Sequence, residues 1–281
     1  MKPLDGKVVL VTGAARGIGR AISAEFLTRG ARLVLTDIDE AALLQTADEL
    51  RTTEDSVLAF SADVTSEVQV NEMIHRSISE AGALDVLVLN AGVSVSGPAE
   101  VVPIEDWRWI TDINMWSHVY AVRAALPYFK ERNSGHLVHV SSAAGIFGTP
   151  AAAAYCMTKF AVFGLAESLA TSLNGTGIGV SVVCPQFVDT DIGLRARVTT
   201  APDSPVGAED IKQVSRQMMK DSGLPPEKVA QAVVEGVEED RFLILPHPEI
   251  LKFAQIKWAD PERYIGKASE ALKAQGKLFG E

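Results

Sequence analysis

The chain has 281 residues, 47% of them hydrophobic and 22% charged, which is enough for one large α/β domain with a full core. Its formal net charge of −10 argues against a nucleic-acid partner, because a protein that binds the phosphate backbone needs a basic face. No apolar run reaches the ~18 residues of a membrane span, and a strand-like run begins as early as Lys7, so we expect neither a membrane segment nor a signal peptide.

Strand-like and helical patterns alternate along the chain. Strands are predicted at 7–11, 32–36, 57–61, 85–89, 136–140, 178–183 and 242–245, and helices at 18–29, 39–51, 66–80, 105–131, 152–174 and 226–238. This alternation predicts an α/β fold, a Rossmann-like doubly wound sheet of seven parallel strands with helices on both faces. Ligands of such folds bind beyond the carboxyl ends of the strands.

No repeat or linker divides the chain, so we predict one domain over residues 1–245. Its segment at about 186–225 is rich in proline and glycine and is interpreted as a substrate lid with a helical piece near 208–221. Residues 246–281 are predicted to be a helical extension of the same domain, with two short helices interrupted at Asp260-Pro261.

Cysteine and histidine usage predicts a cytoplasmic protein without a metal site. Cys156 and Cys184 both lie in apolar sequence, which favours reduced thiols over a disulfide. The five histidines have no metal-ligand spacing with cysteines or carboxylates, and we interpret them as surface or packing residues.

A glycine-rich turn joins the first strand to the first helix, with glycines at 13, 17 and 19. Glycines allow the backbone to approach a phosphate, and the following helix directs free N–H groups and a positive dipole at it. The turn is therefore a candidate dinucleotide site, although a glycine triplet alone also fits an ordinary turn.

Asp37 ends the second strand, about 20 residues after the glycine turn, where an acidic residue binds the ribose hydroxyls of a dinucleotide. Such a carboxylate repels a 2′-phosphate, so Asp37 favours NAD over NADP. Asp37 and Asp39 could instead cap the helix that follows. Arg16 argues for the other cofactor, because it could meet a 2′-phosphate.

Tyr155 and Lys159 stand four residues apart at the start of a predicted helix and so share one face of it. A nearby ammonium lowers the pKa of a phenol, which would make Tyr155 an acid or base near neutral pH. Strand 136–140 delivers Ser141 and Ser142 to the same crevice, where a serine could hold a substrate oxygen. Alone, the tyrosine–lysine spacing also fits a surface pair.

Together these motifs resemble the short-chain dehydrogenase/reductase family, of the compact single-domain NAD(P)-dependent type, over roughly residues 5–245. The family's glycine motif matches Thr12 to Gly19, its Asn-Ala-Gly motif matches residues 90–92, and its Tyr-x-x-x-Lys motif begins at Tyr155. Asn114 matches the catalytic asparagine, and Ser142, thirteen positions before the tyrosine, matches the catalytic serine.

The resemblance implies a role for each of the catalytic residues Asn114, Ser142, Tyr155 and Lys159. Tyr155 exchanges a proton with the substrate oxygen, which Ser142 positions. Lys159 binds the nicotinamide ribose, and Asn114 holds a water that relays protons. The residues expected around the cofactor are Gly13, Arg16, Gly17, Ile18, Gly19, Asp37, Asp63, Val64, Asn90, Ala91, Gly92, Tyr155, Lys159, Pro185, Val188 and Thr190.

The substrate is expected to meet three crevice loops and the catalytic pair, through Ser94, Val95, Ser142, Phe147, Tyr155, Gln186, Phe187 and Ile192. The loop residues are mostly apolar and none is basic, which predicts a bulky uncharged secondary alcohol or its ketone, such as an aryl, terpenoid or steroid-like molecule. Gln186 departs from the Pro-Gly of the family, and its side chain either reaches the pocket or only changes the loop.

These observations favour an NAD-dependent alcohol dehydrogenase. Two alternatives stay open, an NADPH-dependent ketone or 3-oxoacyl reductase and a non-catalytic dinucleotide-binding regulator. The regulator should lack part of the Ser/Tyr/Lys set, which this chain keeps. The resemblance also implies a homodimer or homotetramer, built on the helices that begin near residues 105 and 152.

Overall fold

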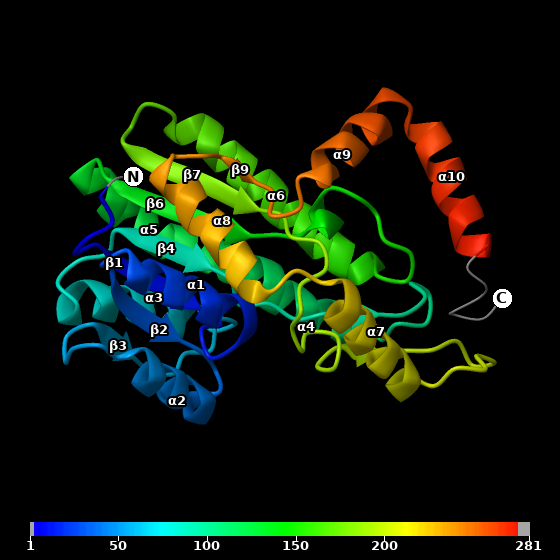
Figure 1. Cartoon of the computed structure of the whole chain (residues 1–281), viewed down its shortest axis with the longest axis horizontal. Coiled ribbons are helices and arrows are strands. Elements are labelled where there is room, and N and C mark those ends of the chain that lie inside the picture. Colours follow the sequence, from blue (N-terminus) through cyan, green and yellow to red (C-terminus); the bar gives the residue numbers. More distant parts are fainter. Residues whose placement is uncertain (1–2, 275–281) are drawn as a thin grey trace.

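The computed structural model describes residues 3–274. Seven parallel strands form one sheet in the order β3-β2-β1-β4-β6-β7-β9, which confirms the predicted doubly wound architecture (Figure 1). The strands are β1 (Val8–Thr12), β2 (Arg32–Thr36), β3 (Val57–Ala59), β4 (Val86–Leu89), β6 (Gly135–Val140), β7 (Ile178–Val183) and β9 (Leu243–Ile244). Most strand residues are buried because helices cover both faces, which explains their continuous apolar sequence.

Two separate apolar cores lie on the two faces of the sheet. On one face α1 (Gly17–Thr28), α2 (Glu40–Leu50) and α8 (Pro226–Glu238) pack against the strands (Figure 1). On the other face lie α3 (Glu67–Glu80), α5 (Ser117–Arg132) and α6 (Ala153–Leu173). The chain winds outward from β1 in both directions, so the order of strands reverses between β1 and β4. This reversal opens the crevice in which ligands of such sheets bind.

The predicted helix over 105–131 is wrong as a single element. The structure has α4 (Ile104–Thr111), a π-helical turn at Asp112–Trp116, and then α5. The side chain of Asn114, inside this turn, accepts from Val93 N at 2.8 Å and donates to Val93 O at 2.9 Å and to Thr158 Oγ1 at 3.2 Å. Such turns are frequent at functional sites, and this one holds a buried asparagine against the segment after β4.

The segment predicted to be a lid has more regular structure than its loop-like sequence indicated. It contains α7 (Ala208–Ser222) and the short strand β8 (Arg197–Val198), which pairs with β5 (Val95–Ser96). Val188 and Leu224 pair at its two ends and close it at the base. The 3-10 turn at Ala143–Gly145 follows β6. The two short strands were missed because two residues carry no period-two pattern.

Beyond β9 the chain continues into α9 (Glu249–Ala259) and α10 (Pro261–Ala274), which extend away from the sheet (Figure 1). The break at Asp260-Pro261 is as predicted, and residues 275–281 of the predicted extension lie outside the described residues. Lys257 donates to the carbonyl of Ile146 at 2.7 Å, and the ring of Tyr264 stacks on Phe147 with centroids 6.2 Å apart. Among residues 3–274, none of the helices combines the length and the apolar character that a membrane crossing requires.

Candidate active site

The backbone packs so closely around the glycine turn that Gly13 and Gly19 have no space for a side chain. Gly13 has φ +64°, and a Cβ there would lie 2.9 Å from Ala91 Cα. A Cβ on Gly19 would lie 2.2 Å from the carbonyl oxygen of Gly13. Asn90 fixes the turn from β4, because its amide donates to the carbonyls of Thr12 and Gly13 at 3.0 and 3.1 Å.

The amino end of α1 fits an anion. No side chain caps this helix at Arg16, whereas Asp39 caps α2 and Ser66 caps α3. The first N–H groups of α1 and its positive dipole therefore face the crevice without a side-chain acceptor. Gly17 opens this end, and Thr190 lies beside it, since a Cβ on Gly17 would be 3.3 Å from the Thr190 methyl group. This cradle fits the pyrophosphate of a dinucleotide.

Asp37 is not a helix cap. Its carboxylate accepts from Ala15 N in the glycine turn at 3.1 Å and from Asp39 N at 3.0 Å. Both contacts hold the carboxylate beside the glycine turn, at the carboxyl end of β2 and within the predicted crevice.

Arg16, the residue that could meet a 2′-phosphate, pairs with Asp39. This hydrogen bond is the main reason why the pKa of Asp39 is lowered from its ordinary value. Asp39 also accepts from Ala42 N at 3.2 Å as the cap of α2. The cationic side chain at this position is thus already matched by a carboxylate.

The four predicted catalytic residues converge at the carboxyl ends of β4 and β6. Lys159 donates to the carbonyl of Val140 at 3.0 Å, and its Nζ lies 5.6 Å from the centre of the Tyr155 ring. A Cβ on Gly92 would lie 3.3 Å from Asn114 Oδ1 and 3.5 Å from Lys159 Nζ. Gly92 therefore lies directly beside both groups, and a side chain there would crowd the Asn114 amide.

Ser142 extends from the end of β6 into a short 3-10 turn. Its hydroxyl accepts from Ala144 N at 3.1 Å and donates to the carbonyl of Pro185 at 3.4 Å. It also forms a hydrogen bond with Tyr155 that lowers the tyrosine pKa against a larger opposing effect. Ser141 points elsewhere, to the carbonyl of Lys159 at 2.8 Å. The two serines thus have different hydrogen-bond partners, and Ser142 is the one that bonds to Tyr155.

The pKa of Tyr155 is shifted upward, opposite to the effect expected from Lys159. Burial raises the pKa of Tyr155 to about 12 and lowers the pKa of Lys159 to about 8. The physical reason is that desolvation disfavours both charged forms, and the ammonium is directed at Val140 rather than at the phenol. Tyr155 is consequently a neutral phenol near pH 7, the form that donates a proton.

The other predicted cofactor residues lie around the crevice in different ways. Asp63 accepts from Thr65 N at 2.9 Å, and Val64 packs against the apolar core beneath it. Ala91 N donates to Thr12 Oγ1 at 3.1 Å, which joins β4 to β1. Ile18 packs into the core under α1, while Val188 is buried at the base of the lid.

The predicted substrate residues are only partly brought together. Ile192 and Ser94 line one small cavity beside α7. Phe147 is not part of that cavity, and its ring stacks on Tyr264 of α10. Val95 is 1% exposed and packs against Ile110, so its side chain faces the core. Gln186 and Phe187 are exposed at the start of the lid.

His247 contacts this region, although no motif in the sequence marks it as functional. It lies just after β9, and its ring accepts from Gln186 N at 3.2 Å and bonds to the carbonyl of Phe187 at 3.1 Å. Since a backbone N–H can only donate, the proton of the neutral ring is on Nε2. The base of the lid is therefore anchored by a residue 61 positions away in the sequence.

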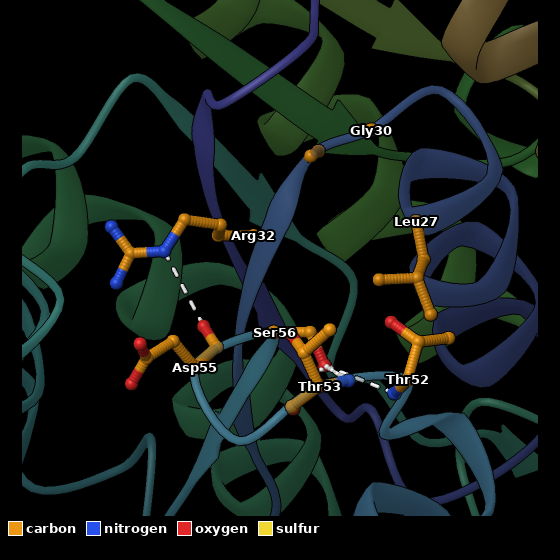
Figure 2. A pocket seen from close by; sticks show the side chains of 8 residues that line it. Leu27, Gly30, Arg32, Thr52, Thr53, Asp55 and Ser56 are labelled. Carbon is orange, nitrogen blue, oxygen red and sulfur yellow. Dashed lines mark hydrogen bonds between the residues drawn. The ribbon is translucent and has the colours of Figure 1, made fainter.

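A cavity of about 210 Å³ lies at the opposite, amino ends of β2 and β3 (Figure 2). Its polar groups bond to one another: Arg32 donates to the carbonyl of Asp55 at 3.3 Å, and Ser56 Oγ accepts from Thr52 N and Thr53 N at 3.0 and 3.1 Å (Figure 2). It lies at the end of the sheet opposite to the converging residues above.

Comparison with known proteins agrees with this geometry. The profile described as "short chain dehydrogenase" matches residues 7–200. A CLA biosynthesis dehydrogenase/reductase of Lactiplantibacillus plantarum is 34% identical over 89% of this chain and 91% of its own. A 1-deoxy-11-beta-hydroxypentalenate dehydrogenase of Streptomyces exfoliatus is 39% identical over 74% of this chain and 78% of its own.

A solved structure shows the same fold. The crystal structure of a short-chain dehydrogenase/reductase from Burkholderia phymatum in complex with NAD has a TM-score of 0.85 and 32% identity, and covers 93% of this chain and 96% of that one. The chain therefore belongs to the short-chain dehydrogenase/reductase family, and it is an oxidoreductase acting on CH–OH groups. Its fold binds a nicotinamide dinucleotide, which the glycine cradle and the uncapped end of α1 fit.

Proposed function

We propose that the protein is an NAD-dependent oxidoreductase that interconverts a secondary alcohol and a ketone by hydride transfer. The observation that carries this proposal is the convergence of Asn114, Ser142, Tyr155 and Lys159 beside an uncapped helix end that fits a dinucleotide. When bound, the nicotinamide would supply the hydride acceptor or donor. The chain would supply proton transfer and orientation.

In the proposed mechanism the Tyr155 hydroxyl donates its proton to the ketone oxygen, and the tyrosinate accepts it back from the alcohol. Ser142 holds the same oxygen by a hydrogen bond. Lys159 holds the ribose, and Asn114 orders a water that relays protons from Lys159. The space at Gly92, which Asn114 Oδ1 and Lys159 Nζ flank, supports the last step.

NAD is the proposed cofactor because the end of β2 carries two carboxylates. Asp37 would accept from the ribose hydroxyls, and both acids would repel a 2′-phosphate. The pairing of Arg16 with Asp39 supports this choice, since a guanidinium already matched by a carboxylate is a poor phosphate site.

The cofactor choice makes a prediction for a double variant. Wild-type protein should have a higher kcat/KM with NAD than with NADP. Asp37→Ala together with Asp39→Ala removes the repulsion and frees Arg16, so the NAD/NADP ratio should fall by about tenfold or more. Steady-state kinetics with both cofactors measure the ratio, and Asp48→Ala on the exposed side of α2 is the control. A wild-type preference for NADP would instead support the reductase alternative.

The substrate that we propose is a bulky, largely apolar molecule. The exposed Phe187, the half-buried Phe147 and Ile192 support an apolar site. The relative from Streptomyces exfoliatus is named as a dehydrogenase of 1-deoxy-11-beta-hydroxypentalenate, a hydroxy compound. An aryl, terpenoid or steroid-like secondary alcohol fits these features.

The direct experiment is a screen of secondary alcohols with NAD, in which the absorbance of reduced nicotinamide reports turnover. We expect oxidation of bulky ring alcohols and none of phosphorylated sugars. A protein that binds NADH but turns over no alcohol or ketone would support the regulator alternative. The complete set of Ser142, Tyr155 and Lys159 argues against that outcome.

We also propose a homodimer or homotetramer in the cytoplasm, with residues 246–281 as an extension of the domain at 1–245. Trp116 and Met157 are 41% and 46% exposed at the starts of α5 and α6, the helices that the family pairs, which supports an oligomer. Both cysteines are buried free thiols, which supports a reducing compartment.

A further inference from the structure

A small cavity lies between the lid helix α7 and the paired strands β5 and β8. Its volume is about 50 Å³, and its walls include Ser94 and Ser96 from β5 and its approach, Ile192, and Lys212, Ser215 and Met219 from α7. A water needs roughly 10–15 Å³ on this measure, so the cavity holds a group of a few atoms, the size of a carboxylate.

Three serines contribute free hydroxyl groups to the lining of this cavity. The hydroxyls of Ser94, Ser96 and Ser215 have no hydrogen-bond partner between residues 3 and 274, although all three residues are half-buried. These hydroxyls are only partly buried, so each is free to donate to a group that enters the cavity.

Lys212 adds a positive charge to these donors. Its side chain is 26% exposed, and its ion pair within the described residues is a loose one of 3.9 Å to the exposed Glu209. The nearby acids Asp189 and Asp191 are held by Arg216 at 2.6 and 3.0 Å. The ammonium of Lys212 is thus available to an anion, and the three hydroxyls can each donate to it.

The cavity is close to the catalytic residues. Ser94 stands two residues after Gly92, which faces Lys159 and Asn114, and two residues span at most ~7 Å. Ile192 stands two residues after Thr190, which lies against Gly17. Ile192 and Met219 give the same cavity apolar walls. One molecule with an apolar body can therefore reach both places.

We propose that this cavity is a carboxylate subsite, in which Lys212 and the three serines bind the acid group of an otherwise apolar hydroxy or oxo acid. The inference rests on the proposed function and changes its substrate from uncharged to monoanionic. Lys212 escaped the sequence analysis because it lies in the lid helix, and only the fold brings it to Ser94. A cavity of this size is too small for a whole nucleotide.

The test uses ring secondary alcohols that carry one carboxylate, from hydroxycyclohexanecarboxylate to lithocholate, each assayed beside its methyl ester. Wild-type protein should oxidise at least one acid with a kcat/KM about tenfold or more above that of its ester. Lys212→Met should remove this acid/ester preference, Lys212→Arg should keep it, and Ser215→Ala should reduce it a few-fold. Lys220→Met, an exposed lysine on the same helix, is the matched control and should change neither rate.

An acid/ester ratio that is equal in Lys212→Met and wild type overturns the subsite, as does a wild-type preference for every ester. Calorimetric titration of lithocholate into the NADH-bound protein measures binding without turnover, so it distinguishes a failure of the subsite from a failure of the proposed function. If no alcohol is oxidised, the proposed function fails, yet loss of lithocholate binding in Lys212→Met still supports the subsite. Equal binding by the two proteins overturns it.

Discussion

Burial determines the pKa values of the titratable residues at this site. Desolvation raises the pKa of Tyr155 and lowers that of Lys159, because burial favours the neutral form of each side chain over its charged form. Three histidines under the site are governed in the same way. Burial lowers the pKa of His118 well below 6.5, and that of His136 and His139 to about 3.

Tyr155→Phe should remove the proton donor while leaving the cavity shape intact. Turnover should fall by about 10²–10⁴-fold, the usual contribution of a positioned acid or base. NADH binding, followed by nicotinamide fluorescence, should change little. Tyr120→Phe on α5 is the control and should retain full activity. A Tyr155→Phe protein with nearly normal turnover would assign proton transfer to another group.

The buried histidines predict acid sensitivity. Their pKa values are lower in the folded chain than in the unfolded chain, so unfolding takes up protons below pH 6.5 and stability falls as the pH falls toward 3. The free energy of unfolding at pH 5 should be lower than at neutral pH by about 2 kcal/mol for each of His136 and His139. Urea unfolding at several pH values measures this slope.

His136→Asn should flatten that slope, whereas His75→Asn, on the exposed side of α3, should not. A histidine pair explains part of the effect: His118 Nδ1 and His139 Nδ1 lie 3.0 Å apart, and neither Nε2 has a partner among the described residues. A free energy of unfolding that is constant between pH 7 and pH 5 would contradict the burial of neutral imidazoles.

At the scale of elements, the glycine turn and α1 form one unit that leaves no space for a side chain. The contact of Gly19 with the Gly13 carbonyl brings the helix end against the turn, and Asn90 closes it from β4. The π turn does the same for Asn114, which a regular helix would direct elsewhere. Irregular geometry at these two places therefore produces the site.

Gly19→Ala should disrupt this unit, because its Cβ would lie 2.2 Å from a carbonyl oxygen. We expect a loss of about 1–3 kcal/mol in the free energy of unfolding, together with weaker NADH binding. Gly164→Ala is the matched control: its Cβ meets nothing within 4 Å, and a helix gains up to about 1 kcal/mol from alanine. Thermal unfolding and fluorescence titration compare the two, and equal NADH affinities would contradict the packing argument.

For the whole molecule, the seven-stranded sheet places every predicted functional loop at one end, while the cavity at the other end carries no such residues. The C-terminal extension joins this end through His247, Lys257 and Tyr264. Its exposed apolar side chains include Phe253 and Trp258, at 50% and 67%.

Light scattering should give two or four times the mass of one chain. Met157→Glu, in the helix expected to pair, should lower that mass because a charge would be buried without a partner. Val214→Glu, at an apolar side chain 54% exposed on the lid helix, should leave it unchanged. A wild-type mass of one chain would contradict the proposed oligomer.

The sequence by itself determined the architecture, because alternating apolar strands and helices allow few topologies. It also predicted the catalytic residues, because Tyr155 and Lys159 share one helix face and the order of the motifs resembles the short-chain family. That resemblance favoured Ser142 over Ser141 as the catalytic serine, and in the structure the two serines bond to different partners.

Only the tertiary structure decided how distant segments meet. It paired Arg16 with Asp39, directed Lys159 at Val140 rather than at the phenol, and raised the tyrosine pKa by burial. It inserted a π turn where the apolar spacing was helical, and it brought His247 to the base of the lid and Lys212 to Ser94. Desolvation and long-range packing depend on three-dimensional neighbours, and no local pattern in the chain encodes them.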